Sequence, residues 1–256
     1  MKRFLYLIKS DLKRGIISKR FLIAFFIIIL AVIFAAWQSL FLLREQRIQG
    51  LPPGYFLNFI NQALKSEGII FVLPMLSTIP YAGQFMEEFR TSFCNFILIR
   101  SKKSQYILAK IIVNGLCGWL CVCAGVIFVI VVGGLCYWPR EQKGDINWNI
   151  FVNETTLLII KLSFMGMLWA SLGTFLGLIN KSIYMVYGGP FLVNYVLVIL
   201  STRYFTNAYL LNPREWVQQL HIWHEGYILM GVFLFTVSLI FIVLEGVTMH
   251  WKLKRR

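Results

Sequence analysis

Charged side chains are scarce in this sequence. Only 14% of its 256 residues are Asp, Glu, Lys or Arg, whereas 58% are hydrophobic. A soluble domain has about 25% charged residues, so this chain has too few to cover a surface in water. The high hydrophobic content also excludes a disordered protein. The composition indicates a protein whose main solvent is lipid.

Acidic residues are the scarcest charged type. The chain has 11 Asp and Glu against 25 Lys and Arg, which gives a formal net charge of +14. In a soluble protein this excess would suggest nucleic-acid binding. Here seven basic residues fall within residues 1–20 and four within 252–256, and both clusters adjoin long apolar runs. That distribution is typical of membrane topology, so we expect no nucleic-acid partner.

Motifs of cofactor chemistry are missing or incomplete. No Gly-x-x-x-x-Gly-Lys-Ser/Thr phosphate loop occurs, so we expect no nucleotide-binding site, and no other cofactor or catalytic residue, in this chain. The chain has five cysteines, and this odd number argues against a framework in which every cysteine is paired in a disulfide. The three within residues 117–123 favour core packing over a metal site. His221, His224 and Glu225 match neither helical zinc-protease motif, so interfacial packing is favoured over metal binding there as well.

Six apolar runs are long enough to cross a bilayer, which requires about 20 helical residues. The first, residues 21–43, is too long for the core of a cleaved signal peptide. Pro74 and Pro80 are expected to kink the second. We therefore predict an all-α membrane protein with one transmembrane domain over residues 1–256. Its six expected spans are residues 21–43, 68–86, 111–138, 155–180, 182–202 and 227–248.

The distribution of Lys and Arg predicts the orientation. With the N-terminus inside, the inner segments hold 17 basic and four acidic residues, and the outer segments hold eight basic and seven acidic residues. Cytoplasmic segments carry the excess of Lys and Arg. We therefore expect a multi-pass protein of the plasma membrane with both termini in the cytoplasm.

Several segments between the spans are amphipathic. Residues 1–20 place apolar side chains on one helical face among the basic residues, which predicts an interfacial helix; ordinary flanking charge is the alternative. Residues 55–65 predict a short outer helix, and the aromatic-rich residues 203–226 predict short outer helices before span six. Gly173 and Gly177 have the spacing of small residues at close helix contacts, within or between subunits.

The connection between spans two and three, residues 87–110, predicts a short amphipathic helix on the cytoplasmic surface; an ordinary loop is the alternative. Its apolar residues share one helical face: Phe89, Phe93, Phe96 and Ile97. Basic residues follow at Arg100, Lys102 and Lys103.

This segment resembles the permease subunits of ABC transporters of the type-two exporter class. Glu87 corresponds to their acidic residue at the inner end of span two, and Ser92 to a following Thr. Lys103 corresponds to a basic turn, and residues 109–110 to the small residue and Lys that begin span three. The order of interfacial helix, six spans, long outer loop and basic C-terminus extends the resemblance along the chain.

The resemblance implies that residues 87–110 form a coupling helix that docks on a separate cytoplasmic ATPase. Thr91 and Arg100 replace a Gly and a Pro of the family pattern. Two ATPase subunits would bind ATP and Mg²⁺, and a second permease copy or a related permease would complete the pathway in the lipid membrane. The implied coupling residues are Glu87, Glu88, Arg90, Thr91, Ser92, Phe93, Phe96, Ile97, Arg100 and Lys103.

Two other function classes remain open. Glu87, Glu88 and Arg90 are similar to the Glu-Glu-x-x-x-Arg of intramembrane proteases, with one residue in place of three before the Arg and no His within an inner span; this alternative would make the chain a membrane-embedded hydrolase. A non-catalytic scaffold or immunity protein is the other alternative. A transporter is expected to export an amphipathic or apolar cargo such as a peptide, drug or lipid, because no span carries a row of ionisable residues. Glu245, at the inner end of span six, is expected to pair with cations of the N-terminal helix.

Overall fold

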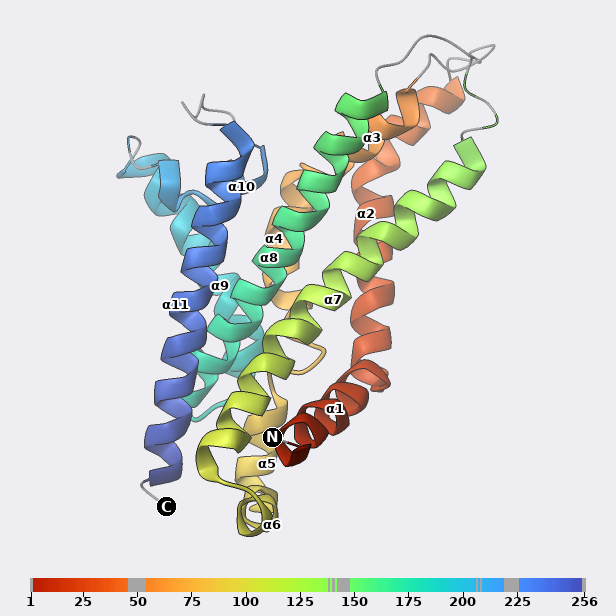
Figure 1. Cartoon of the computed structure of the whole chain (residues 1–256). Helices are drawn as coiled ribbons and strands as arrows, with labels where there is room; N and C mark the ends of the chain where they lie inside the picture. Colours follow the sequence, from red (N-terminus) through yellow and green to blue (C-terminus); the bar gives the residue numbers. More distant parts are fainter. Residues whose placement is uncertain are drawn as a thin grey trace.

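The chain forms a bundle of helices in a computed structural model that describes residues 2–45, 54–137, 139, 141, 148–205, 207, 209–218 and 226–254 (Figure 1). The helices within these ranges are α1 (Lys2–Ile16), α2 (Lys19–Glu45), α3 (Tyr55–Leu64), α4 (Glu67–Leu76), α5 (Gln84–Arg90), α6 (Phe93–Arg100), α7 (Lys103–Tyr137), α8 (Trp148–Asn180), α9 (Ile183–Arg203), η2 (Tyr209–Leu211), α10 (Pro213–Gln218) and α11 (Gly226–Lys254).

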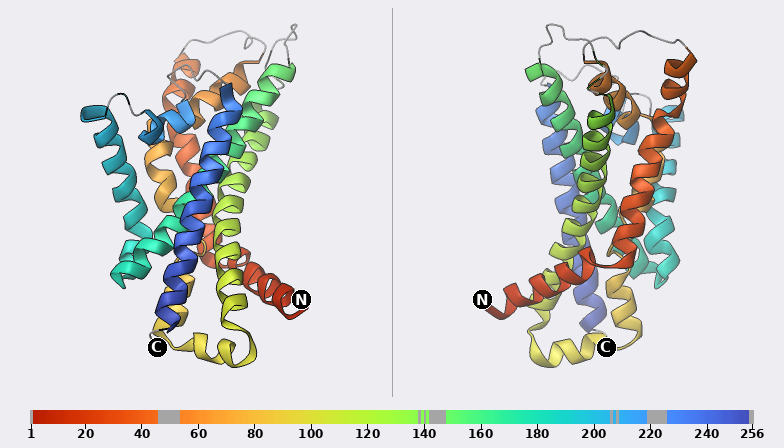
Figure 2. Two further views of the ribbon diagram at one scale, coloured as in Figure 1. Left: turned by 60° about the vertical axis from the view of Figure 1, so that its left-hand side comes forward. Right: turned by 90° about the vertical axis from the view of Figure 1, so that its right-hand side faces the viewer.

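Five helices of the described part are long and apolar enough to cross a bilayer: α2, α7, α8, α9 and α11. Helix α7 has 35 residues and α8 has 33, so each exceeds the roughly 20 residues that a bilayer requires. These helices run side by side, and α1, α5, α6 and the end of α11 gather at one end of them (Figure 2). The fold is that of a multi-pass membrane protein.

The second expected span, residues 68–86, is not one helix. Helix α4 ends at Leu76, residues 77–83 form turns, and α5 begins at Gln84. Pro80 lies within these turns, where its missing N–H and its ring oppose a continuous helix. Ten residues of α4 extend only about 15 Å, half of the hydrocarbon thickness. The structure thus has a full break where the sequence predicted a kink, and a sixth membrane-crossing segment stays a prediction.

The broken segment is enclosed by protein. Ser77 and Thr78 are buried, and their hydroxyl groups donate to the carbonyls of Pro74 and Met75 at 3.2 and 2.7 Å. Tyr81 in the same turn is also buried. Non-helical backbone at membrane depth is tolerated where protein surrounds it, so the turn between α4 and α5 satisfies this condition.

Small residues bring the central helices close together. A Cβ atom on Gly118 of α7 would lie 2.8 Å from the Gly166 carbonyl oxygen of α8, and one on Gly166 would lie 2.9 Å from that of Gly118. Gly173 likewise approaches the Val186 carbonyl oxygen of α9, with 2.6 Å to an added Cβ. The predicted close contact at Gly173 thus lies within the subunit, between α8 and α9.

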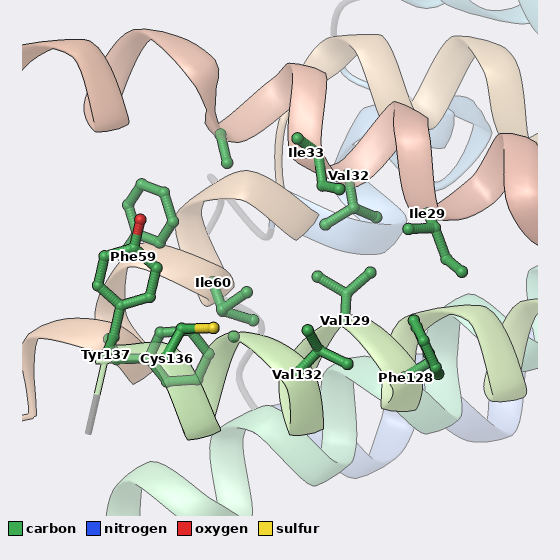
Figure 3. Close-up of a pocket in the computed structure, with 13 residues that line it drawn as sticks. Ile29, Val32, Ile33, Phe59, Ile60, Phe128, Val129, Val132, Cys136 and Tyr137 are labelled. Carbon is green, nitrogen blue, oxygen red and sulfur yellow. The ribbon is translucent and has the colours of Figure 1, made fainter. Parts of the chain in front are cut away.

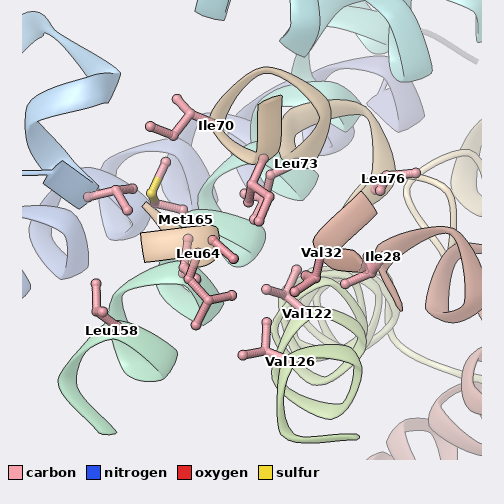
Figure 4. Packing of buried hydrophobic residues seen from close by; sticks show 14 of the residues in the cluster. Ile28, Val32, Leu64, Ile70, Leu73, Leu76, Val122, Val126, Leu158 and Met165 are labelled. Carbon is pink, nitrogen blue, oxygen red and sulfur yellow. The ribbon is translucent and has the colours of Figure 1, made fainter. Parts of the chain in front are cut away.

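The largest apolar core lies where α2, α3, α4, α7 and α8 meet (Figure 4). Leu64 of α3 and Ile70 of α4 are fully buried there, facing Val122 of α7 and Met165 of α8. Because lipid is as apolar as these side chains, the core is held by close packing rather than by exclusion of water.

The end of the bundle away from α6 is covered by short helices. Helix α3 buries Phe56, Phe59 and Ile60. In the connection between α9 and α11, the Trp216 ring of α10 stacks on the Trp169 ring of α8, with 6.1 Å between ring centroids. The described short helices α3 and α10 thus pack inward on the long helices, and their place on the outer side of a membrane stays a prediction.

Candidate coupling surface and its buried charge cluster

The chain turns sharply between α5 and α6. Ser92 adopts a left-handed conformation, with φ 60° and ψ 11°, and the Thr91 hydroxyl donates to the Glu87 carbonyl oxygen at 2.9 Å. These features end α5 at Arg90 and begin α6 at Phe93. The predicted single helical face is wrong, because Phe89 belongs to a different helix from the apolar residues that follow it.

Helix α6 lies across the end of the bundle (Figure 2). Its Phe93, Phe96 and Ile99 side chains are 44%, 67% and 81% exposed, and the two Phe rings have centroids 6.4 Å apart. Ile97, which the sequence placed on the docking face, is instead half-buried against the core. Ile99 takes its place on the exposed apolar face, which consists of Phe93, Phe96 and Ile99 and is called the α6 face below.

The opposite side of α6 is anchored. Cys94 is fully buried, and Ile97 and Leu98 pack partly buried against a second core cluster. At the C-terminal end of the helix, the Ser101 hydroxyl donates to the Ile97 carbonyl oxygen at 2.9 Å. The Lys103 ammonium then donates to the Leu253 carbonyl oxygen of α11 at 2.7 Å. These contacts hold α6 to α7 and α11 and present its apolar face outward.

Beside α6 lies a cluster of four charged residues from three helices, called the buried charge cluster: Asp11 and Arg14 of α1, Glu88 of α5 and Lys110 of α7. Lys110 Nζ lies 2.7 Å from Glu88 Oε1 and 3.1 Å from Asp11 Oδ2. Arg14 Nη1 lies 3.2 Å from the same Glu88 oxygen. The Lys110 side chain is fully buried and that of Glu88 is 3% exposed, whereas Asp11 is 16% and Arg14 55% exposed at the edge of the cluster.

Neutral polar groups complete this cluster. The Tyr106 hydroxyl donates to Glu88 Oε2 at 2.7 Å, and the Gln84 amide donates to Glu88 Oε1 at 3.2 Å. Lys110 donates to the Tyr81 hydroxyl at 3.0 Å. Two carboxylates and two cations balance in charge. Because buried ions are tolerated when they are paired and hydrogen-bonded, the cluster fixes α1, α5 and α7 relative to one another.

Glu87 occupies a more exposed position. Its carboxylate pairs with Arg20 of α2 at 2.7 Å, with the two side chains 33% and 43% exposed. Pairs of this kind contribute about 0–1 kcal/mol. Arg90, one of the implied coupling residues, is exposed and belongs to no ion pair among the described residues. Arg100 is described only by its backbone, at the end of α6.

Glu245 of α11 has a different partner from the one that the sequence suggested. It is fully buried, and its Oε1 accepts from the Asn114 amide of α7 at 3.1 Å. Asn114 also donates to Thr174 Oγ1 and to the Ala170 carbonyl oxygen of α8, at 2.9 and 3.2 Å. Arg14 of α1 forms its ion pair with Glu88 and not with Glu245. The expected pairing with N-terminal cations is therefore wrong.

Two oxygens at this contact have no hydrogen-bond partner within the described part of the chain: Asn114 Oδ1 and Glu245 Oε2. Both atoms are hydrogen-bond acceptors, so they cannot form a hydrogen bond with each other unless the carboxyl group is protonated. The amide orientation follows from its surroundings, because the nitrogen end faces three oxygens. The contact links α7, α8 and α11 through hydrogen bonds rather than through an ion pair.

The structure brings Glu88 together with Asp11, Tyr81 and Tyr106, which the sequence analysis did not assign to the site, and with Lys110, which it matched only to the start of span three. Two signals were present: Asp11 is the one acidic residue within residues 1–20, and Lys110 is followed by an uncharged apolar run. The histidine motif that the sequence analysis considered as a metal site, formed by His221, His224 and Glu225, lies outside the described residues.

Comparisons with protein-family profiles, with curated proteins and with solved structures found no match.

Proposed function

We propose that this chain is the membrane-spanning permease subunit of an ATP-driven exporter whose ATPase is a separate cytoplasmic protein. The observation that carries the proposal is the α6 face: three large apolar side chains exposed on a helix that is anchored beside the most basic end of the bundle. Such a face outside the bilayer is typical of a protein-binding site.

The proposed partner chemistry follows from this face. An amphipathic helix binds a partner by laying its apolar side chains into a groove, and aromatic anchors contribute most of the binding energy. The ATPase would therefore present an apolar groove to Phe93, Phe96 and Ile99. Mg²⁺ and ATP would be bound by the ATPase subunits, two of which would serve a pair of permeases.

Transmission of movement requires a stiff connection between α6 and the spans. The left-handed turn at Ser92, the buried Cys94 and the buried charge cluster provide such a connection to α1, α5 and α7. A displacement of α6 would then move the start of α7, and the cargo pathway with it. An apolar or amphipathic cargo fits the apolar spans, and the basic end of the bundle would face the cytoplasm, with both termini on that side.

The test is purification of the affinity-tagged full chain from its native plasma membrane, followed by measurement of ATP hydrolysis in nanodiscs. The wild type is expected to retain an ATPase, and the Phe93→Ala, Phe96→Ala, Ile99→Ala variant to lose it. The matched control is Val243→Ala, Val247→Ala on α11, which truncates two side chains that are 62% and 61% exposed. This control should retain hydrolysis.

Equal hydrolysis by the α6 variant and the control would contradict the proposed docking. A wild-type chain that never retains an ATPase, even after chemical crosslinking in membranes, would favour the scaffold or immunity alternative. Proteolytic activity of the purified chain that is lost in Glu88→Gln would favour the hydrolase alternative.

A further inference from the structure

An apolar groove lies between α2, α7 and α3 (Figure 3), and α3 lies at the end of the bundle away from α6 (Figure 1). The volume of the groove is about 260 Å³. Ile29, Val32 and Ile33 of α2 face Phe128, Val129 and Val132 of α7 across it, and Phe59 and Ile60 of α3 close one end (Figure 3).

The chemistry of this groove is almost entirely hydrocarbon. Its other lining residues are Ala36, Phe56, Gly133, Cys136 and Tyr137, so no charged side chain lines it. A water molecule needs two to four polar partners to occupy a cavity, which these walls do not provide. The groove therefore selects an apolar occupant.

The groove opens sideways, toward the surface that faces lipid. Ile33, Phe128 and Val132 line it and are still 42%, 45% and 43% exposed. Beside it, Phe34 and Val131 are 81% and 54% exposed and do not line the groove. An occupant can thus enter from the bilayer without passing through the protein.

The length of the groove matches half of a bilayer. Its walls run along residues 29–36 of α2 and 128–137 of α7, which are about 10 and 14 Å of helix. One leaflet of the hydrocarbon core is about 15 Å thick. At the far end, the Phe56 backbone N–H donates to Glu141 Oε1 at 2.7 Å, so the groove ends where polar groups begin.

We propose that this groove binds one acyl chain of a phospholipid of the outer leaflet. The chain would lie along the helices, between α2 and α7 and beneath α3. A helix of a second copy, about 10 Å across, is too wide for a space of this volume, whereas a single hydrocarbon chain is narrow and flexible. The proposal depends on membrane insertion and, for the choice of leaflet, on the predicted orientation, and not on the proposed ATPase.

The test uses a phosphatidylcholine that carries a photoactivatable diazirine in the middle of one acyl chain. The full chain is reconstituted with this lipid, extracted and washed in detergent so that loosely associated lipid exchanges, and then irradiated. We expect the retained crosslinks to map to the groove walls, at residues 29–36, 56–60 and 128–137.

Two variants fill the groove from opposite walls: Val132→Trp on α7 and Ile33→Trp on α2. Their matched controls are Val131→Trp and Phe34→Trp, which add the same side chain to neighbouring positions outside the groove. Displacing about two buried methylene groups lowers the affinity for an acyl chain by about tenfold. We therefore expect about tenfold less lipid crosslinking at the groove walls in the filled variants, and unchanged crosslinking in the controls. Size-exclusion profiles and thermal unfolding verify that all four variants fold.

Equal crosslinking in filled and control variants, or no crosslinks at the groove walls after washing, would overturn the proposal. A groove occupied by a second copy is a separate outcome that also overturns it: the filled variants would then lower the oligomer mass, and irradiation would label other surfaces. Lipid crosslinking does not depend on an associated ATPase. A failure of the acyl-chain proposal can therefore be distinguished from a failure of the proposed ATPase docking.

Discussion

Lys110 Nζ and Glu88 Oε1 lie 2.7 Å apart in a site where both side chains are almost completely shielded from solvent. This contact joins α7 to α5 directly before the turn into α6. The Asp11 carboxylate of α1 approaches the same nitrogen at 3.1 Å. One ammonium group therefore holds three helices together at the basic end of the bundle.

The first prediction concerns that ammonium group. Lys110→Met should lower the free energy of unfolding by about 3–5 kcal/mol, because it leaves two carboxylates without their buried partner. The matched control is Glu87→Gln, which removes an exposed pair worth about 0–1 kcal/mol. Thermal unfolding of both variants in nanodiscs measures the difference. Equal, small effects would show that the buried charge cluster contributes little to stability.

The second prediction concerns Glu245. Glu245→Gln replaces the unpartnered Oε2 by an amide nitrogen that can donate to the unpartnered Asn114 Oδ1. We expect unfolding stability within about 1 kcal/mol of the wild type or above it, whereas Glu245→Leu, which deprives Asn114 of an acceptor, should cost about 1–3 kcal/mol. If the Gln variant loses as much stability as the Leu variant, a charged carboxylate is required there.

The third prediction concerns the turn at Ser92. A left-handed conformation costs a residue with a Cβ atom roughly 1–2 kcal/mol, so Ser92→Gly should keep or raise stability and Ser92→Val should lower it. Ser182→Val is the control, because Ser182 precedes α9 in an extended conformation, with φ −125°, that valine favours. Thermal unfolding and the yield of folded protein measure both. Equal tolerance of Val at the two positions would contradict the left-handed turn.

The fourth prediction concerns the closest crossing of α7 and α8. Gly118→Ala places a methyl group 2.8 Å from both Ala170 Cβ and the Gly166 carbonyl oxygen, and such overpacking costs about 1–3 kcal/mol. Gly231→Ala on α11 is the control, because no atom lies within 4 Å of its added Cβ. Only the first variant should unfold at lower temperature. A neutral Gly118→Ala would mean that the two helices are farther apart.

The fifth prediction concerns orientation. Reporter fusions at Ser101, after α6, should report the cytoplasm, and fusions at Asn147 and Gln218 should report the outside, because Lys and Arg concentrate at the α6 end. Reporters that are active on only one side of the membrane make this measurement. An outside signal at Ser101 would reverse the orientation and remove the α6 face from reach of a cytoplasmic ATPase.

The long helices could be predicted from sequence because each depends on a local property, a run of apolar residues. The break after Leu76 was only partly predictable: Pro74 and Pro80 suggested a kink, but Pro74 lies inside α4 and the helix ends two residues beyond it. Whether a proline bends or ends a helix depends on which neighbours satisfy the freed backbone groups, and a sequence does not contain that information.

The site was harder to predict. The turn at Ser92 contains neither Gly nor Pro, so residues 87–100 resemble one continuous amphipathic helix. The buried charge cluster joins residues that are far apart in the chain, and no local spacing connects Asp11 with Lys110. Once Ser92 divides the segment, Ile97 turns toward the core, against its expected role, and Ile99, which the sequence analysis did not assign, turns outward.

The length of α7 has a mechanical consequence. Its 35 residues form an unbroken rod of about 52 Å, with α6 at one end and a wall of the apolar groove at the other. Gly118, where α7 closely approaches α8, lies about 22 Å from the first residue and about 28 Å from the last. Tilting the rod about this point moves its two ends in opposite directions. If the proposed coupling tilted α7 in this way, Val132 would move opposite to α6, and the groove would widen or narrow with no change in the helix itself.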